Sequence, residues 1–128
     1  MRVGPGSQYQ VAWQYQKRGL PVEIIQEFDN WRKIRDPNGD EGWVHHKLLT
    51  GTRTAIVKPW ETNKETGHTD LHSAKDGSSR IIAKIEPGVI VTLNTCDNNW
   101  CGVDVSTFSG FAEKSDLWGV YPDELIEE

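Results

Sequence analysis

Long apolar runs and basic residues are both scarce in this sequence. The longest uncharged apolar run, residues 88–93, is far shorter than the ~20 residues that a helix needs to cross a bilayer. We therefore predict no membrane insertion. Lysine and arginine number 14 against 19 acidic residues, which gives a formal net charge of −5. This balance argues against a nucleic-acid ligand, because binding to phosphates requires a basic surface.

Cysteine is also scarce, with only Cys96 and Cys101 in the chain. Two thiolates are too few for a structural zinc site, and no histidine is near them in the sequence. Their spacing suits facing positions on two neighbouring strands, where the Cα atoms come close enough for a disulfide. We predict this disulfide, with two free thiols as the alternative, and we predict no metal and no cofactor.

Apolar residues at helical spacing are rare, whereas several segments alternate as strands do. Val22, Ile24 and Gln26 are expected on one strand face, and the same alternation directs Ile34 and Val103 into a core. Turn sequences separate these segments: GPGS, DPNGD, KDGSS and EPG. DPNGD combines proline with Asn-Gly and predicts a tight antiparallel hairpin. The sequence therefore predicts an all-β protein of small barrels or sandwiches.

One pattern occurs twice along the chain. Its landmarks are Gly19, Trp31, Gly42 and Leu49 in the first copy, and Gly88, Trp100, Gly110 and Leu117 in the second. The first Gly-to-Trp spacing is 12 and the last Gly-to-Leu spacing is 7 in both copies, while the Trp-to-Gly spacing is 11 and then 10. Such a match indicates an internal repeat. We place the copies at residues 1–57 and 69–128, joined by a polar linker at 58–68.

The repeated unit resembles a known family. LPVEIIQEFDNWRKIRDPNGDEGWVHHKLL resembles the core of an SH3 domain, and MRVGPGS resembles the start of bacterial SH3-like (SH3b) domains. The whole chain is similar to tandem SH3-like proteins of Gram-negative, alphaproteobacterial-type bacteria, a largely uncharacterised group, in which the second copy carries a motif like CDNNWC. The resemblance implies two small five-stranded, partly open barrels, each with a short 3₁₀-like segment. Gly42 and Gly110 are then expected where strands bend at barrel corners.

Aromatic residues supply the candidate binding surface. Trp31 and Trp100 occupy the position of the tryptophan that lines the peptide groove of SH3 domains, and strand alternation places them opposite the core. The other candidates are Tyr9, Trp13, Tyr15, Trp43 and Phe111. Stacking on peptides or glycan faces is one interpretation, and packing against the barrels is the other.

The SH3 pattern is incomplete beside these aromatic residues. Where it has a proline and a tyrosine, this chain has His45 and Leu48 in the first copy, and Glu113 and Asp116 in the second. A groove for proline-rich peptides therefore lacks two of its usual walls.

No catalytic constellation is recognisable. His45 and His46 are adjacent, so on a strand their rings are expected on opposite faces, where they could not ligate one ion together. His72 is expected in a turn. The carboxylates, Asp36 among them, are expected on solvated loops, and the acidic end at residues 121–128 is expected to be solvated.

The family resemblance implies a non-enzymatic binding module of the bacterial envelope that recognises peptidoglycan or its peptide stem. Two alternatives remain at this stage. One is a protein-interaction or scaffold module that pairs with an envelope protein at an open barrel edge, and the other is an accessory domain of a cell-wall hydrolase. Localisation is expected to be periplasmic or secreted, on the assumption that a signal peptide lies upstream. The sequence predicts neither the oligomeric state nor which copy binds.

Overall fold

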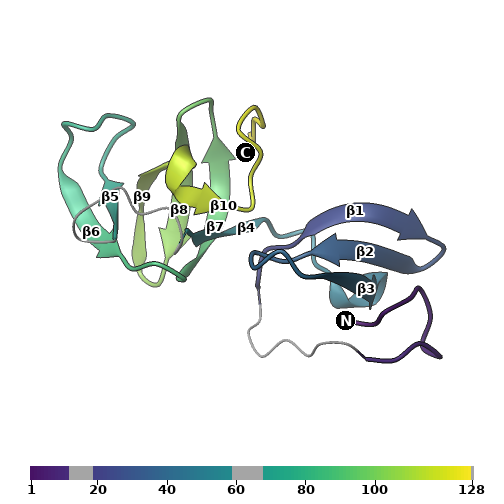
Figure 1. Cartoon of the computed structure of the whole chain (residues 1–128). Helices are drawn as coiled ribbons and strands as arrows, with labels where there is room; N and C mark the ends of the chain where they lie inside the picture. The colour runs from purple at the N-terminus through teal and green to yellow at the C-terminus, as the bar shows by residue number, and fades with distance from the viewer. Residues whose placement is uncertain (12–18, 59–67, 128) are drawn as a thin grey trace. The chain divides into compact units, whose positions relative to one another are not determined.

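The chain divides into two compact units, Met1–Gly51 and Thr52–Glu128 (Figure 1). The computed structural model describes residues 1–11, 19–58 and 68–127. Residues 52–57 lie in the second unit, although the repeat spacing placed them in the first copy. The reason is that a strand in this segment pairs with strands of the second unit. Most of the predicted linker, residues 59–67, lies outside the described residues.

Both units are built from β-strands, as predicted. The elements are β1 (Glu23–Phe28), β2 (Trp31–Arg35), β3 (Glu41–His45), the 3₁₀ helix η1 (His46–Leu48), β4 (Thr54–Val57), β5 (Thr69–His72), β6 (Ile81–Ile85), β7 (Ile90–Cys96), β8 (Trp100–Val105), β9 (Phe108–Glu113), the 3₁₀ helix η2 (Lys114–Asp116) and β10 (Leu117–Trp118). The first unit holds a sheet of order β1-β2-β3, and the second a sheet of order β10-β4-β7-β8-β9-β5-β6. Across the described part of the chain, no helix is long and apolar enough to span a bilayer.

The internal repeat appears as one arrangement of elements that both units share, which we call the frame. In each unit three consecutive antiparallel strands lead into a 3₁₀ helix: β1-β2-β3-η1 in the first, and β7-β8-β9-η2 in the second. Gly19 and Gly88 precede the first strand of each frame and have φ values of 75° and 87°. Glycine occupies this left-handed region without a steric penalty. The landmark glycines therefore set the entry of the chain into each frame.

A β-bulge lies at the same place in both copies. The register shifts between Ile24 and Gln26 in β1 and between Leu93 and Thr95 in β7, which are positions 69 residues apart. The extra residue reverses the alternation. Ile24 consequently shares a face with its partner Ile34, whereas Gln26 lies on the opposite face. The prediction that Ile24 and Gln26 share one face was therefore wrong.

The DPNGD turn closes the β2–β3 hairpin as predicted, with Gly39 at a φ of 91°. Asp36 is buried in this turn and is not solvated as expected. Its Oδ1 accepts hydrogen bonds from the backbone N–H groups of Asn38 and Asp40, each at 2.9 Å. A carboxylate with two backbone donors can be buried without leaving its charge unsatisfied.

Gly42 and Gly110 allow a second chain segment to approach the third strand of each frame closely. A Cβ on Gly110 would lie 2.7 Å from the carbonyl oxygen of His72 and 2.9 Å from the Leu71 side chain. A Cβ on Gly42 would lie 3.0 Å from the carbonyl oxygen of Arg2 and closer still to the Met1 side chain. The structure shows that these glycines make room for a crossing backbone, and the expected corner bends stay a prediction.

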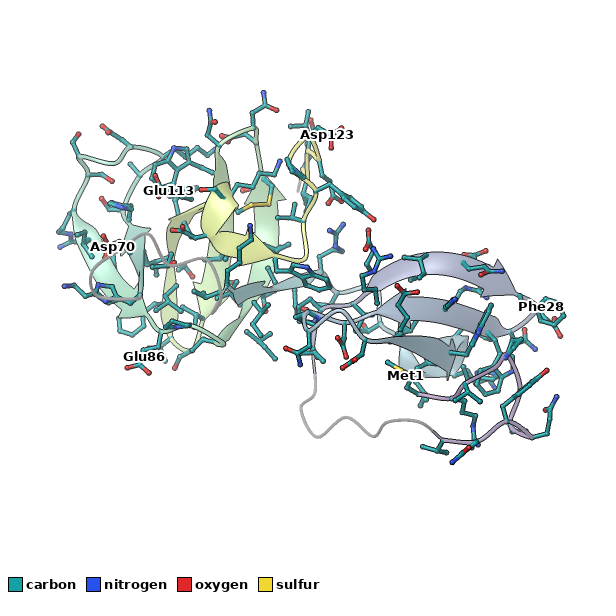
Figure 2. All side chains as sticks on the ribbon, in the orientation of Figure 1. Met1, Phe28, Asp70, Glu86, Glu113 and Asp123 are labelled. Carbon is teal, nitrogen blue, oxygen red and sulfur yellow. A yellow bond between two sulfur atoms is a disulfide. The ribbon has the colours of Figure 1, made fainter. Side chains whose placement is uncertain are left out.

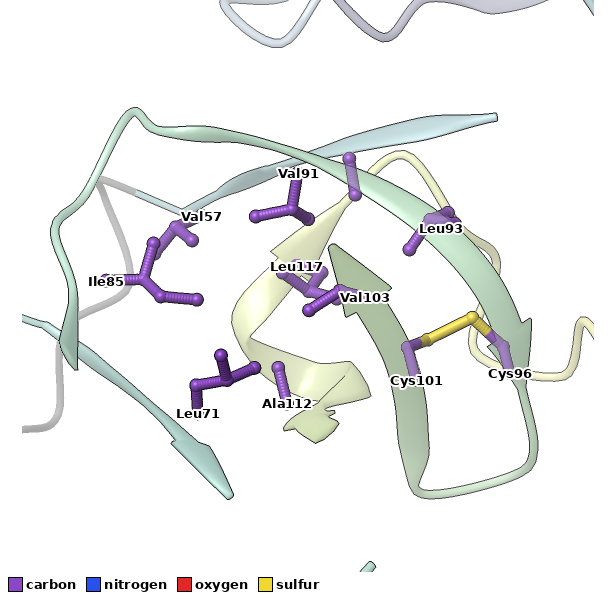
Figure 3. Close-up of a cluster of buried hydrophobic side chains, with 11 residues drawn as sticks. Val57, Leu71, Ile85, Val91, Leu93, Cys96, Cys101, Val103, Ala112 and Leu117 are labelled. Carbon is purple, nitrogen blue, oxygen red and sulfur yellow. A yellow bond between two sulfur atoms is a disulfide. The ribbon is translucent and has the colours of Figure 1, made fainter. Parts of the chain in front are cut away.

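The second unit has a connected hydrophobic core, which its curled sheet encloses (Figure 3). The buried members are Ala55, Val57, Leu71, Ile85, Val91, Leu93, Cys96, Cys101, Val103, Ala112 and Leu117. Cys96 and Cys101 face each other across β7 and β8 and form a disulfide. The predicted pairing of the two cysteines is confirmed, as are the inward positions of Ile34 and Val103.

The described part of the acidic C-terminal segment is largely exposed, as expected, and it is also attached to the second unit. Ile126 makes an isolated bridge with Cys96. Glu124 accepts two hydrogen bonds from the Arg53 guanidinium, at 2.6 and 2.9 Å. Buried Lys114 donates from Nζ to the backbone carbonyls of Pro122, at 3.0 Å, and Glu124. The segment stays bound because its own carbonyls satisfy a buried ammonium.

Candidate functional site

A row of rings crosses the three strands of the first unit at one end of the sheet. Phe28 pairs with Trp31, and Trp31 pairs with His45, so all three side chains lie on one face. We call Phe28, Trp31 and His45 the aromatic row. The Trp31 and His45 rings meet edge to face, with centroids 5.5 Å apart and an interplanar angle of 78°. This arrangement holds the indole in place.

The aromatic row is open to solvent at the β1–β2 turn. Phe28 is 60% exposed, and its ring lies at the tip of the hairpin (Figure 2). Trp31 and His45 are half-buried. Leu48 in η1 is also exposed. Exposed rings on a rigid sheet offer flat apolar faces at little cost in side-chain entropy, which suits stacking on peptides or sugars.

His45 and His46 extend the row, contrary to the expectation of opposite faces. Their rings stack at 4.8 Å with an interplanar angle of 28°. The expectation failed because β3 ends at His45 and η1 begins at His46, so the strand alternation stops between them. His45 Nδ1 accepts a hydrogen bond of 3.2 Å from the backbone N–H of Lys47. The neutral ring of His45 therefore carries its proton on Nε2.

The remaining first-unit candidates contribute unequally. Trp43 is only 8% exposed, and its backbone forms a ladder with Arg2, so its ring offers little surface to a ligand. Tyr9 is exposed and its ring lies against Gly4. Trp13 and Tyr15 lie outside the described residues. Trp43 lies on the same sheet face as Trp31 and His45, but it is buried, and a platform that joins it with Tyr9 stays a prediction.

The corresponding row of the second unit is acidic. Trp100 pairs with Glu113 on β9, and the backbone N–H of Asp97 donates to the Trp100 carbonyl at 2.8 Å. Asp97 and Glu113 thus take the places of Phe28 and His45. Hydrogen bonds from the backbone N–H groups of Asn99 and Trp100 hold the pKa of Asp97 below its ordinary value. Both backbone positions beside Trp100 are therefore acidic residues.

Trp100 has a different histidine partner from Trp31. His72 meets the indole edge to face, with centroids 5.4 Å apart and an interplanar angle of 87°. His72 is buried at the end of β5, so the prediction that it lies in a turn was wrong. Phe111 is the backbone partner of His72, and the Lys75 ammonium lies 5.7 Å from the Phe111 ring centroid. A cation already occupies the surroundings of this ring.

Among the described residues, no group of three or more histidine, cysteine or acidic residues could hold a metal ion. Both cysteines form the disulfide, so neither provides a thiolate for nucleophilic catalysis. Sequence reasoning missed Phe28 and the His45–His46 stack. The available signal for Phe28 was a large apolar residue next to the Asp-Asn turn.

The family model described as the bacterial SH3 domain matches residues 1–51 and 71–119. The chain is 24% identical over 122 residues to a Bacillus subtilis (strain 168) protein named "Putative N-acetylmuramoyl-L-alanine amidase YrvJ". That alignment includes 87% of this chain but 23% of the relative, so the chain spans about a quarter of the relative's length. A structure titled "Structure of NlpC2 from Trichomonas vaginalis" aligns with 76% of this chain and 34% of its own, at a TM-score of 0.43 and 13% identity.

Proposed function

The chain belongs to the bacterial SH3 domain family, and from this premise we propose that it is a non-enzymatic binding module for the bacterial cell wall. The similarity to part of a protein named as an N-acetylmuramoyl-L-alanine amidase supports a wall ligand, because that name describes an enzyme of peptidoglycan. The ligand on this proposal is peptidoglycan or its peptide stem. The protein would act in the periplasm or outside the cell, where its disulfide would persist.

We assign the contact surface to the aromatic row of the first unit. The observation that carries the assignment is the exposed Phe28 ring beside Trp31 on the three-stranded sheet. Ring faces stack on the apolar faces of sugars and on extended peptides without requiring a charged partner. In the second unit the positions beside Trp100 hold Glu113 and Asp97, which pairs with Lys75 at 3.4 Å, so neither position offers a flat apolar ring.

Co-sedimentation with purified peptidoglycan sacculi tests this proposal. We expect the intact chain to pellet saturably, and we expect Phe28→Ala to raise the apparent dissociation constant by about tenfold, which corresponds to about 1.4 kcal/mol of binding. Phe108→Ala is a matched control, because Phe108 is 46% exposed and lies in the second unit. Circular dichroism would verify that both variants are folded. Absence of pelleting by the intact chain at moderate salt would refute the wall-binding proposal.

If the chain is instead an accessory domain of a wall hydrolase, the same aromatic row would be its contact surface. It is favoured by the partial alignment with the amidase-named relative. On this alternative the chain would target a catalytic domain and would itself release no muropeptides. A dye-release assay on labelled sacculi checks this point, and cleavage by the isolated chain would contradict the non-enzymatic assignment.

A further inference from the structure

The first half of β1 is an open sheet edge. Within residues 1–11, 19–58 and 68–127, the sheet order β1-β2-β3 gives β1 one strand neighbour, β2. Ile24 faces the same side as buried Ile34, yet it is 49% exposed. An apolar side chain so exposed on an edge strand indicates that none of the described residues covers this side of the sheet fully.

The second unit shows what covers the equivalent edge. There β4 pairs with the first half of β7, with Ala55 opposite Val91. The backbone N–H of Leu93 donates to the Arg53 carbonyl at 2.9 Å, and the N–H of Val57 donates to the Val89 carbonyl at 3.0 Å. With this strand in place, Leu93 is 6% exposed. The added strand supplies both the hydrogen bonds and the apolar cover.

The two edges correspond residue by residue. The offset of 69 that relates the two bulges matches Leu93 with Ile24 and Val91 with Val22. It also matches Ile90 with Pro21. An antiparallel strand forms backbone hydrogen bonds with a given neighbour at every second residue. From Val89 onward, the residues of this segment that bond to β4 are the odd-numbered ones, so Ile90 does not form such a bond. Pro21, which lacks an N–H, therefore leaves the hydrogen-bonding pattern of this edge intact.

We propose that residues 20–25 accept an extended segment of a partner protein as a fourth strand. By analogy with Ala55, which lies opposite buried Val91, the partner presents a small uncharged side chain opposite Val22. The partner needs no basic ends, because Glu23 and Glu27 already pair with Arg35 and Arg32, at 2.9 and 3.3 Å. Strand addition of this kind combines backbone hydrogen bonds with alternate side-chain pockets.

A synthetic peptide with capped ends and the sequence TRTAIVK, that of residues 52–58, is the probe. It is added to the full-length chain, and backbone amides are followed by NMR. We expect saturable shifts and slowed hydrogen exchange at residues 20–25, and no such change in β7, whose edge β4 already occupies. The matched control peptide carries Ala55→Asp. It should bind at least about tenfold more weakly, because a carboxylate would be buried.

A tethered version removes the entropy of association. A copy of residues 52–70 is fused directly before Met1. The fusion keeps the spacing found in the second unit, because Met1 lies over Gly42 as Leu71 lies over Gly110. The amides of residues 20–25 should then gain protection, and the Ala55→Asp graft should not confer it. If neither the free nor the tethered strand protects these amides, the proposal is wrong.

Two further outcomes separate this inference from its rivals. A concentration-dependent dimer of the chain alone, with protection at β1, would overturn the assignment of a partner protein in favour of a second copy. Trp31→Ala should leave peptide binding unchanged, because Trp31 lies at the other end of the sheet from Val22. The strand edge and the proposed wall-binding row can thus fail independently.

Discussion

The two units share one frame and differ in what completes it. In the second unit β4, β5, β6 and β10 join the three-strand frame and surround a core of eleven buried residues. In the first unit the described buried hydrophobic side chains are Ile34, Trp43 and Val44. The frame follows from the bulge and the landmark glycines, which both copies keep. The completeness of the core follows from the strands that flank the frame; among its described residues the first copy keeps only the crossing at Arg2, as an isolated bridge with Trp43.

The same comparison holds for the surfaces. Position for position, the first unit places Phe28 and His45 beside its tryptophan, while the second places Asp97 and Glu113 there. Outward-facing residues can change in this way because they do not determine the register of the sheet, which depends on the inward set. A repeated frame can therefore present two chemically different surfaces.

The largest expected difference in unfolding free energy is between alanine substitutions at Leu93 and at Ile24, the equivalent residues beside the two bulges. Leu93→Ala should lower the free energy of unfolding of the second unit by about 3 kcal/mol, because it empties a buried site. Ile24→Ala should cost less than about 1 kcal/mol, because its side chain is half exposed. Urea titrations followed by tryptophan fluorescence measure both variants. Equal losses would contradict the inference that β1 lacks a covering strand.

The disulfide distinguishes the second unit from the first. Cys96 and Cys101 are five residues apart, and the chain-entropy model predicts that replacing both by alanine costs about 2 kcal/mol. Alkylation followed by mass spectrometry should detect no free thiol before reduction and two after it. Modification without reductant would show that the thiols are free.

Alanine substitutions at Gly110 and Gly42 test the two chain segments that cross over these glycines. Gly110→Ala should cost about 2 kcal/mol, because the new methyl group meets the backbone carbonyl of His72. Gly42→Ala should cost about 1 kcal/mol, because the nearest atoms belong to the flexible Met1 side chain. Thermal unfolding of the two variants gives the order. A larger loss from Gly42→Ala would contradict this account of the crossing.

The smallest effect is a pH dependence confined to the second unit. The hydrogen bond from Arg53 lowers the pKa of Glu124 below its ordinary value of 4.5. A carboxyl group with a lowered pKa contributes stability above its unfolded-state pKa and loses it as the pH falls through its folded-state pKa. The contribution of this exposed pair should be below about 1 kcal/mol. Denaturation of Glu124→Gln between pH 7 and pH 3 should show a shallower decline than the intact chain, and an identical decline would exclude the effect.

Local sequence signals predicted the frame well. The Asn-Gly turn, the facing cysteines, and the inward positions of Ile34 and Val103 all follow from turn chemistry and strand alternation. The bulge was not predictable from alternation, since one extra residue reverses every later position in β1. The place of β4 was also missed, because strand pairing between distant segments leaves no local pattern.

The site was only partly predictable. Strand alternation placed Trp31 and Trp100 on the face opposite the core, but it gave no information on their neighbours. Those neighbours depend on register, which sets Phe28 and His45 beside Trp31. The burial of Trp43 and Lys114 likewise depends on segments that cross from elsewhere in each unit.

The central claim is that the first unit carries the wall-binding surface, and paired tryptophan variants test it most directly. Trp31→Ala and Trp100→Ala would be titrated against purified sacculi under identical salt conditions, after both are shown to be folded. The account predicts that Trp31→Ala weakens binding by about tenfold or more, whereas Trp100→Ala leaves it within about twofold, a difference below ~0.5 kcal/mol. An intact chain that binds while Trp100→Ala alone abolishes pelleting would contradict the claim.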